Sequence, residues 1–193
     1  MPQSFHRRED GTVFRVGDTI LVNSEGGTDF IAEIKEIKEK KKSDDGDMKL
    51  WVAWFYLPEE AVGGRKMFHG SRELFRSNHH DEIYAGTITR KCQVLTLDAY
   101  QALPRPIKED VYFSRVFYSA QTQKFKPPRW TTYCTCKMPY NPDLDMVQCS
   151  FCREYFHVHC LQSAGHLPPG PLPDVFDCHQ CKGGWKESGA AAQ

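Results

Sequence analysis

Cysteines gathered between residues 134 and 181 constrain the fold of this chain more than any other feature. That stretch holds seven of the eight cysteines. Together with one histidine they form four closely spaced pairs, Cys134-x-Cys136, Cys149-x2-Cys152, His157-x2-Cys160 and Cys178-x2-Cys181. Structural zinc takes four thiolate or imidazole ligands in a tetrahedron, and each such pair supplies half of a site. The spacing therefore predicts two structural zinc ions.

We expect the pairs to interleave, because each metal then joins the first half of the segment to the second. The first site would consist of Cys134, Cys136, His157 and Cys160, and the second of Cys149, Cys152, Cys178 and Cys181. About fifty residues bury little apolar surface, so folding depends on metal binding, which contributes roughly 10 to 16 kcal/mol per site in zinc peptides. His159 is the alternative ligand to His157, but it would form a tight pair with its direct neighbour Cys160.

A disulfide framework is the competing interpretation of these cysteines. The N-terminus carries no signal-peptide pattern, and short cysteine pairs of this kind are typical of metal binding in a reducing compartment. Cys92 lies outside the set and is expected to be a small buried apolar residue, since no nucleophile arrangement accompanies it. We therefore expect zinc and no catalytic cysteine.

The ligand order, four cysteines, a histidine and three cysteines, resembles that of a PHD finger. The four-residue gap before His157 and the aromatic Phe176 two residues before the last pair carry this resemblance. RING-type ubiquitin ligases also use two cross-braced zinc sites and are the enzyme alternative. Most of them place the histidine fourth, so the present order predicts a non-enzymatic finger over residues 131–183.

The composition excludes several other classes of protein. The 193 residues include 25 basic and 25 acidic side chains, and 40% are hydrophobic, which is typical of one or two globular domains. A DNA-binding domain normally carries a basic excess, so direct DNA binding is expected to be weak or absent. No apolar run reaches the length of a membrane span.

Short apolar runs in the N-terminal part predict a mainly β fold with small α content. We expect strands over residues 19–22, 30–37, 50–56, 91–97 and 111–118, with a charged hairpin loop from Lys38 to Asp47. Side chains alternate along a strand, so Trp54 and Tyr56 share one face. They are either part of an aromatic core or a platform for a ligand.

Several ordered elements resemble a BAH domain. They are Trp54-Phe-Tyr-Leu-Pro-Glu-Glu60, His69-Gly70, Glu73-Leu-Phe-Arg-Ser77 and Lys91-Cys-Gln-Val94. With the finger, the chain resembles the plant BAH-PHD histone readers. The resemblance implies a β-barrel-like BAH domain over 11–124, packed against the finger, with a disordered tail over 184–193. It also implies a nuclear protein that acts in transcriptional regulation and has chromatin-modifying complexes as partners.

In that family the BAH domain binds histone H3 trimethylated at lysine 27, and the PHD finger binds di- or trimethylated lysine 4. The resemblance assigns the BAH methyl-lysine cage to Phe30, Trp54 and Tyr56. His79 and Asp81 would contact the peptide, with loop capping and surface solvation as the alternative. In the finger it assigns the cage to Tyr133, Tyr140, Met146 and Tyr155, and peptide contacts to Asp143 and Asp145. Tyr155 stands where the family has tryptophan, a stronger partner for cations.

Two alternatives to the histone reader stay open from the sequence. A RING-like ubiquitin ligase would use the zinc module as an enzyme. A methyl-independent nucleosome or DNA scaffold would use the BAH domain without a cage. The aromatic residues of the finger also have a second interpretation, as a cover for the small zinc core. Asp143 and Asp145 could likewise belong to a solvated loop.

Overall fold

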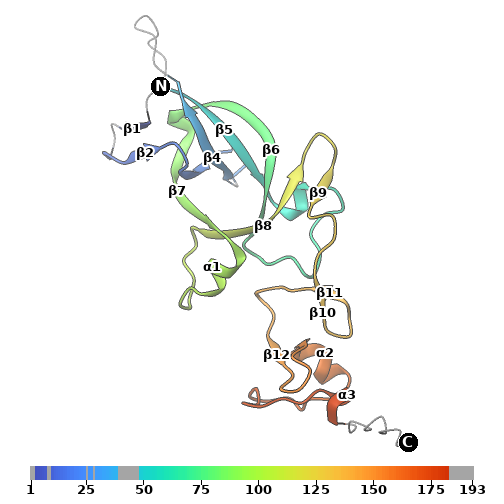
Figure 1. Ribbon diagram of the computed structural model, residues 1–193. Coiled ribbons are helices and arrows are strands. Elements are labelled where there is room, and N and C mark those ends of the chain that lie inside the picture. The colour runs from blue at the N-terminus through green and yellow to red at the C-terminus, as the bar shows by residue number, and fades with distance from the viewer. Residues whose placement is uncertain (1–2, 8–9, 25, 28, 39–47, 183–193) are drawn as a thin grey trace, which may run out of the picture. The chain divides into compact units, whose positions relative to one another are not determined.

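The computed structural model describes this chain except residues 1–2, 8–9, 25, 28, 39–47 and 183–193. The predicted tail over 184–193 and most of the predicted charged loop therefore lie outside the described residues. The chain forms two compact units, Met1–Arg129 and Trp130–Gln193 (Figure 1).

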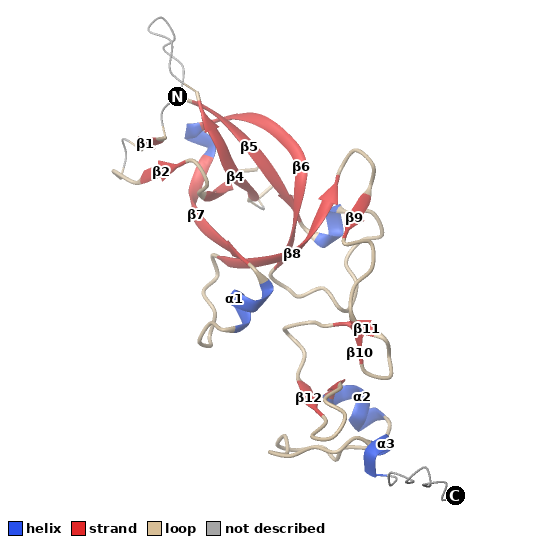
Figure 2. Cartoon of the chain, viewed as in Figure 1, coloured by secondary structure: helices blue, strands red, loops and turns tan. Residues whose placement is uncertain are grey.

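The first unit is a seven-stranded sheet with the strand order β6-β5-β4-β3-β7-β8-β9. An additional pairing of β6 with β8 closes the sheet into a barrel (Figure 2). The strands are β3 (Thr19–Val22), β4 (Phe30–Ile37), β5 (Lys49–Tyr56), β6 (Glu73–Tyr84), β7 (Ile88–Leu95), β8 (Val111–Ser119) and β9 (Lys124–Lys126). A hairpin of β1 (Ser4–His6) and β2 (Val13–Arg15) precedes them. The mainly β fold predicted from the sequence is confirmed.

Short helical turns connect the barrel strands. They are η1 (Pro58–Glu60), η2 (Ala85–Thr87) and α1 (Leu97–Gln101). The strand predicted over 91–97 is wrong at both ends, because β7 covers Ile88–Leu95 and Thr96 caps α1 by accepting a hydrogen bond from the Ala99 N–H at 3.3 Å. A serine or threonine at this position satisfies an amide that has no partner within the helix.

The longest strand, β6, was not predicted. Its first residues are buried, but the segment from Asn78 to Glu82 is polar and largely exposed. It therefore lacks the regular apolar alternation by which strands are recognised. His79 and Asp81 lie within this strand, so their interpretation as loop-capping residues is wrong.

The barrel core has two layers because β5 is buried on both faces. Leu50 and Val52 pack into a cluster with Ile20, Ala32 and Ile34. On the opposite face, Phe55 belongs to a second cluster, made with Leu21, Ile31, Leu74 and Cys92. Cys92 is buried there, and burial raises the pKa of its thiol to about 11. This agrees with the prediction that Cys92 is a small apolar residue.

The second unit is built from short strands around its cysteines. The strands are β10 (Thr132–Tyr133), β11 (Met138–Pro139), β12 (Met146–Gln148) and β13 (Tyr155–His157), followed by the helices α2 (Val158–Ser163) and α3 (His179–Lys182). Its small core combines Val147, Phe156, Leu161, Leu167 and Phe176 with Cys134, Cys149 and Cys178. Among the described residues of the chain, no helix is long and apolar enough to cross a membrane.

Candidate functional site

Two aromatic rings meet at one end of the barrel. Phe30 begins β4 and keeps 49% of its surface exposed. Trp54 lies on β5, opposite Ala32, two residues further along β4. The ring centroids of Phe30 and Trp54 are 6.0 Å apart at an interplanar angle of 72°. The exposed Phe30 ring and the half-buried Trp54 ring thus form a corner.

This corner is part of a cavity of about 310 Å³. The residues that line it are Phe30, Trp54, Phe55, Tyr56, Glu60, His79 and Asp81. The structure therefore brings together all five BAH-domain residues that the resemblance singled out, from strands β4, β5 and β6. Phe55 and Glu60 were not predicted. Glu60 belongs to the quoted Pro-Glu-Glu element, but only the fold turns it toward the cavity.

Hydrogen bonds fix several of these side chains. The Tyr56 hydroxyl lies 2.9 Å from Nδ1 of His79. Burial, assisted by Tyr118 and Glu60, raises the pKa of Tyr56, so its hydroxyl stays protonated. Glu60 accepts a hydrogen bond from the Leu57 N–H at 2.7 Å, which holds its carboxylate at the end of η1.

The charge of the cavity suits a cation. Glu60 and Asp81 contribute carboxylates, and no lysine or arginine stands among the seven described residues that line it. A quaternary ammonium is attracted to ring faces and to carboxylates, and it needs no hydrogen-bond acceptor. The arrangement can therefore hold a methylated ammonium group against Phe30, Trp54 and Tyr56.

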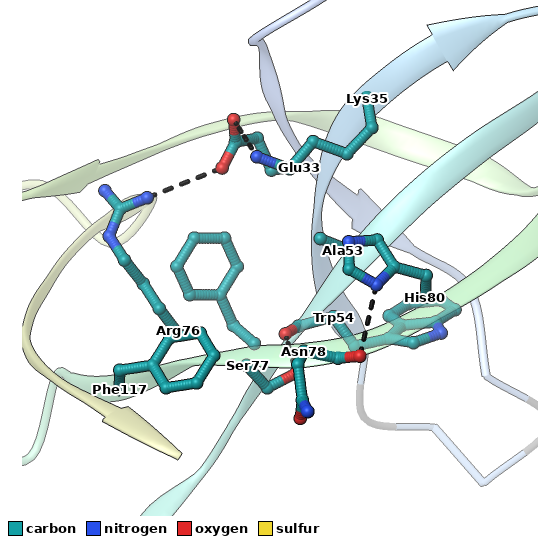
Figure 3. A pocket seen from close by; sticks show the side chains of 10 residues that line it. Glu33, Lys35, Ala53, Trp54, Arg76, Ser77, Asn78, His80 and Phe117 are labelled. Carbon is teal, nitrogen blue, oxygen red and sulfur yellow. Dashed lines mark hydrogen bonds and ion pairs between the residues drawn. The ribbon is translucent and has the colours of Figure 1, made fainter. Parts of the chain in front are cut away.

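A second cavity of about 300 Å³ shares Trp54 and Phe55 with the first (Figure 3). It lies over Ala53, whose cross-strand neighbours are Glu33 and His80. Its charged lining residues are Glu33, Lys35 and Arg76, and Glu33 pairs with Lys35 at 2.7 Å and with Arg76 at 3.4 Å. This cavity therefore has no excess of negative charge, unlike the aromatic one.

The second unit contains two clusters of metal-ligand residues, each with its ligand atoms within 4.8 Å of one another. The first is Cys134, Cys136, His157 and Cys160, and the second is Cys149, Cys152, Cys178 and Cys181. The structure thus groups these side chains in the same two sets as the interleaved spacing. Nδ1 of His157 lies 3.3 Å from Sγ of Cys136 and belongs to the first cluster, whereas Nε2 of His159 lies 3.3 Å from Sγ of its neighbour Cys160.

Backbone amides favour the ionised form of one sulfur in each cluster. Burial opposes ionisation of Cys134 and Cys149, but amide hydrogen bonds lower the pKa of each thiol to about 6. One of these donors is the Cys178 N–H, 3.3 Å from Sγ of Cys149. The pKa of Cys160 rises to about 12, through burial and the neighbouring Cys134 and Cys136. Complete ionisation of the cluster therefore needs a bound cation, so the donor set fits a metal ion.

The finger aromatics lie around β13. The rings of Tyr133 and Tyr155 are 6.1 Å apart and perpendicular, at 89°. Met146 is paired with His157, which puts it on the same face of the β12–β13 hairpin as Tyr155. Tyr140 directly follows β11. A ring contact thus joins two of the four predicted residues, and the strand register puts a third on the same face of the hairpin as Tyr155.

The two aspartates predicted to contact the peptide, Asp143 and Asp145, occupy the loop between β11 and β12. The Asp143 N–H donates to Oδ1 of Asn141 at 2.9 Å, and the Asp145 carbonyl accepts from the Val158 N–H at 3.0 Å. Hydrogen bonds therefore hold the backbone of both residues in place.

The barrel matches a known protein family. The family model described as "BAH domain" aligns with residues 12–129. The chain belongs to the BAH-domain family. The BAH barrel spans most of the first unit, and the elements quoted from the sequence all lie within the matched range.

Relatives cover more than the BAH domain. Chromatin remodeling protein SHL of Arabidopsis thaliana is 38% identical over 167 residues, which are 86% of this chain and 71% of that protein. Chromatin remodeling protein EBS of the same plant is 38% identical over 171 residues, 88% of this chain and 70% of that protein. The resemblance to plant BAH-PHD proteins is thereby confirmed. The crystal structure of the yeast Rsc2 BAH domain aligns with a TM-score of 0.49 and 16% identity, over 64% of this chain and 53% of that chain.

Proposed function

We propose that this protein is a nuclear, non-enzymatic histone reader whose BAH domain binds histone H3 trimethylated at lysine 27. One observation carries the proposal. Three aromatic residues, Phe30, Trp54 and Tyr56, line a single cavity together with the carboxylates of Glu60 and Asp81. Two relatives that share most of the chain are named chromatin remodeling proteins, which supports a role on chromatin.

The physical chemistry of the cavity explains a preference for trimethyl-lysine. A trimethylammonium group cannot donate a hydrogen bond and loses less hydration than a bare ammonium when it leaves water. Each aromatic face contributes roughly 0.5 to 2 kcal/mol to its binding. His79 and Asp81 lie at the same cavity, where they can contact the peptide backbone beside the methylated side chain.

A calorimetric titration with trimethylated and unmethylated lysine 27 peptides tests this function. We expect binding to require methylation and to weaken by at least about tenfold in Trp54→Ala, the loss of about 1.4 kcal/mol that one ring face can supply. Trp51→Ala is the matched control, because Trp51 is also on β5 but stacks on His80 instead of lining the aromatic cavity. Equal affinity for both peptides would refute the cage.

For the second unit we propose two structural zinc ions and a second methyl-lysine site. Each cluster offers four protein ligands, which completes a tetrahedral zinc site and leaves no position for a reactive water. The proposed site for di- or trimethylated lysine 4 consists of Tyr133, Tyr140, Met146 and Tyr155, with Asp143 and Asp145 as peptide contacts. The perpendicular Tyr133–Tyr155 pair supports it.

Two measurements separate this proposal from its alternatives. Binding to nucleosomes through DNA phosphates would weaken steeply with salt, whereas cage binding changes little. A ubiquitin ligase would modify itself in the presence of a charged conjugating enzyme. We expect neither a steep salt dependence nor self-modification. Chromatin-modifying complexes are the proposed partners of the reader when it is bound to the histone.

A further inference from the structure

Strand β6 leaves the regular ladder next to the aromatic cavity. In the pairing of β5 with β6, Ala53 is opposite His80 and Phe55 is opposite Arg76. The three β6 residues between these pairs, Ser77 to His79, therefore face the single residue Trp54. Such bulges redirect side chains and remove ladder hydrogen bonds, and they are frequent beside functional sites.

The Ser77 side chain replaces the hydrogen bonds that the bulge removes. Its hydroxyl donates to the Trp54 carbonyl at 2.7 Å and accepts from the His79 N–H at 3.0 Å. Figure 3 shows Ser77 beside Trp54, at the floor of the second cavity. Ser77 is only 8% exposed, so water does not readily take over these bonds.

Both partners of Ser77 line the aromatic cavity. Trp54 supplies a ring, and His79 lies 2.9 Å from the Tyr56 hydroxyl through its Nδ1. The Ser77 hydroxyl thus links the backbone carbonyl of Trp54 to the backbone N–H of His79, and the His79 ring in turn contacts the Tyr56 hydroxyl. Asn78 holds the outer side of the same bulge, because its Oδ1 accepts from the Ala120 N–H at 3.0 Å.

We infer that Ser77 is a positioning residue of the aromatic cavity, which fixes the distance between Trp54 and His79 without contacting the ligand. This inference rests on the proposed methyl-lysine function. It also explains why the Glu-Leu-Phe-Arg-Ser element ends in a serine: the hydroxyl closes the bulge, and a residue without one leaves the partly buried Trp54 carbonyl and His79 amide without this partner.

The test is Ser77→Ala, with Ser114→Ala as a matched control. Ser114 is 7% exposed, lies on the neighbouring strand β8, accepts from the Arg76 N–H at 3.3 Å and donates to the Val116 carbonyl at 3.4 Å. Both variants delete one buried hydroxyl that bridges an amide and a carbonyl.

We expect Ser77→Ala to weaken binding of the trimethylated lysine 27 peptide about 5- to 30-fold, the range for one or two lost hydrogen bonds. Ser114→Ala should bind within about twofold of the original protein, and Ser77→Thr, which keeps the hydroxyl, should restore most of the affinity.

A double-mutant cycle separates positioning from a general loss of stability. If Ser77 acts through His79, the effect of Ser77→Ala shrinks in a His79→Ala background, whereas the effect of a purely structural change adds. Strict additivity, or unchanged affinity in Ser77→Ala, would overturn the inference.

Hydrogen exchange tests the contact without any peptide. The His79 amide should lose protection in Ser77→Ala and keep it in Ser114→Ala. Unchanged protection at His79 would overturn the inference, even in a protein that binds the peptide. Loss of protection in a protein that binds no methylated peptide would instead refute the proposed function and leave the positioning contact standing.

Discussion

At the scale of single residues, Tyr155 has the clearest effect on what the finger can bind. It keeps 42% of its surface exposed and faces Tyr133 at a right angle. Tyrosine attracts a cation less strongly than tryptophan does. We therefore predict that Tyr155→Trp raises the affinity for a trimethylated lysine 4 peptide by about 2- to 5-fold, measured by calorimetry, because the larger ring adds up to about 1 kcal/mol.

The control for this substitution is Phe151→Trp. Phe151 is an aromatic residue of the same unit with 71% of its surface exposed, but it lies between the ligands Cys149 and Cys152 instead of beside Tyr133. It should leave the affinity unchanged. A gain in Phe151→Trp, or none in Tyr155→Trp, would show that the methyl-lysine site lies elsewhere on the finger.

At the scale of elements, one buried ion pair holds the loop before β6 against β8. Glu73 is fully buried, and its carboxylate oxygens lie 2.8 Å from Nε and 3.1 Å from Nη2 of Arg115. The same carboxylate accepts from the Gly70 N–H, and Arg115 donates to the Phe68 carbonyl. The pair thus organises the loop that contains the His-Gly element, and it lies where the β6–β8 pairing closes the barrel.

Removing one charge of this pair should destabilise the barrel strongly. Glu73→Gln removes the counter-ion of the partly buried Arg115 guanidinium and leaves an uncompensated charge beside a fully buried side chain, so we predict a loss of about 3 to 5 kcal/mol in the free energy of unfolding, measured in urea. In Glu59→Gln, which alters the exposed pair of Glu59 with Arg65, the loss should stay below about 1 kcal/mol. Similar losses in the two variants would argue against the buried pair as an anchor.

At the scale of the whole molecule, the two units depend on different interactions. The BAH barrel has a layered apolar core, whereas the second unit has a small core in which cysteines take part. We predict that a zinc chelator unfolds the second unit and abolishes binding to the lysine 4 peptide, while the barrel keeps its β structure and its affinity for the lysine 27 peptide.

Circular dichroism and calorimetry with each peptide measure this difference. Adding zinc back should restore binding to the lysine 4 peptide. If chelation also abolished lysine 27 binding, the barrel would depend on the metal sites of the second unit, and the two units would not be energetically separate.

The sequence by itself determined the features that depend on local chemistry. Ligand spacing sorted eight side chains into the same two sets that the structure brings together, because a tetrahedral site demands closely spaced pairs. Apolar runs located β3 and β4, since their residues alternate or lie wholly in the core. The resemblance to BAH domains singled out five of the seven residues that line the aromatic cavity, although they are distant along the chain.

Only the tertiary structure decided where polar segments go. Strand β6 could not be predicted from apolar alternation. Its backbone is extended because it pairs with β5 and β8. Glu60, at the end of η1, lines the cavity with its carboxylate held by the Leu57 N–H, and Ser77 bridges Trp54 and His79 because a bulge places three residues opposite one. Hydrogen bonds and side-chain directions of this kind depend on neighbours far away in sequence, so no local pattern encodes them.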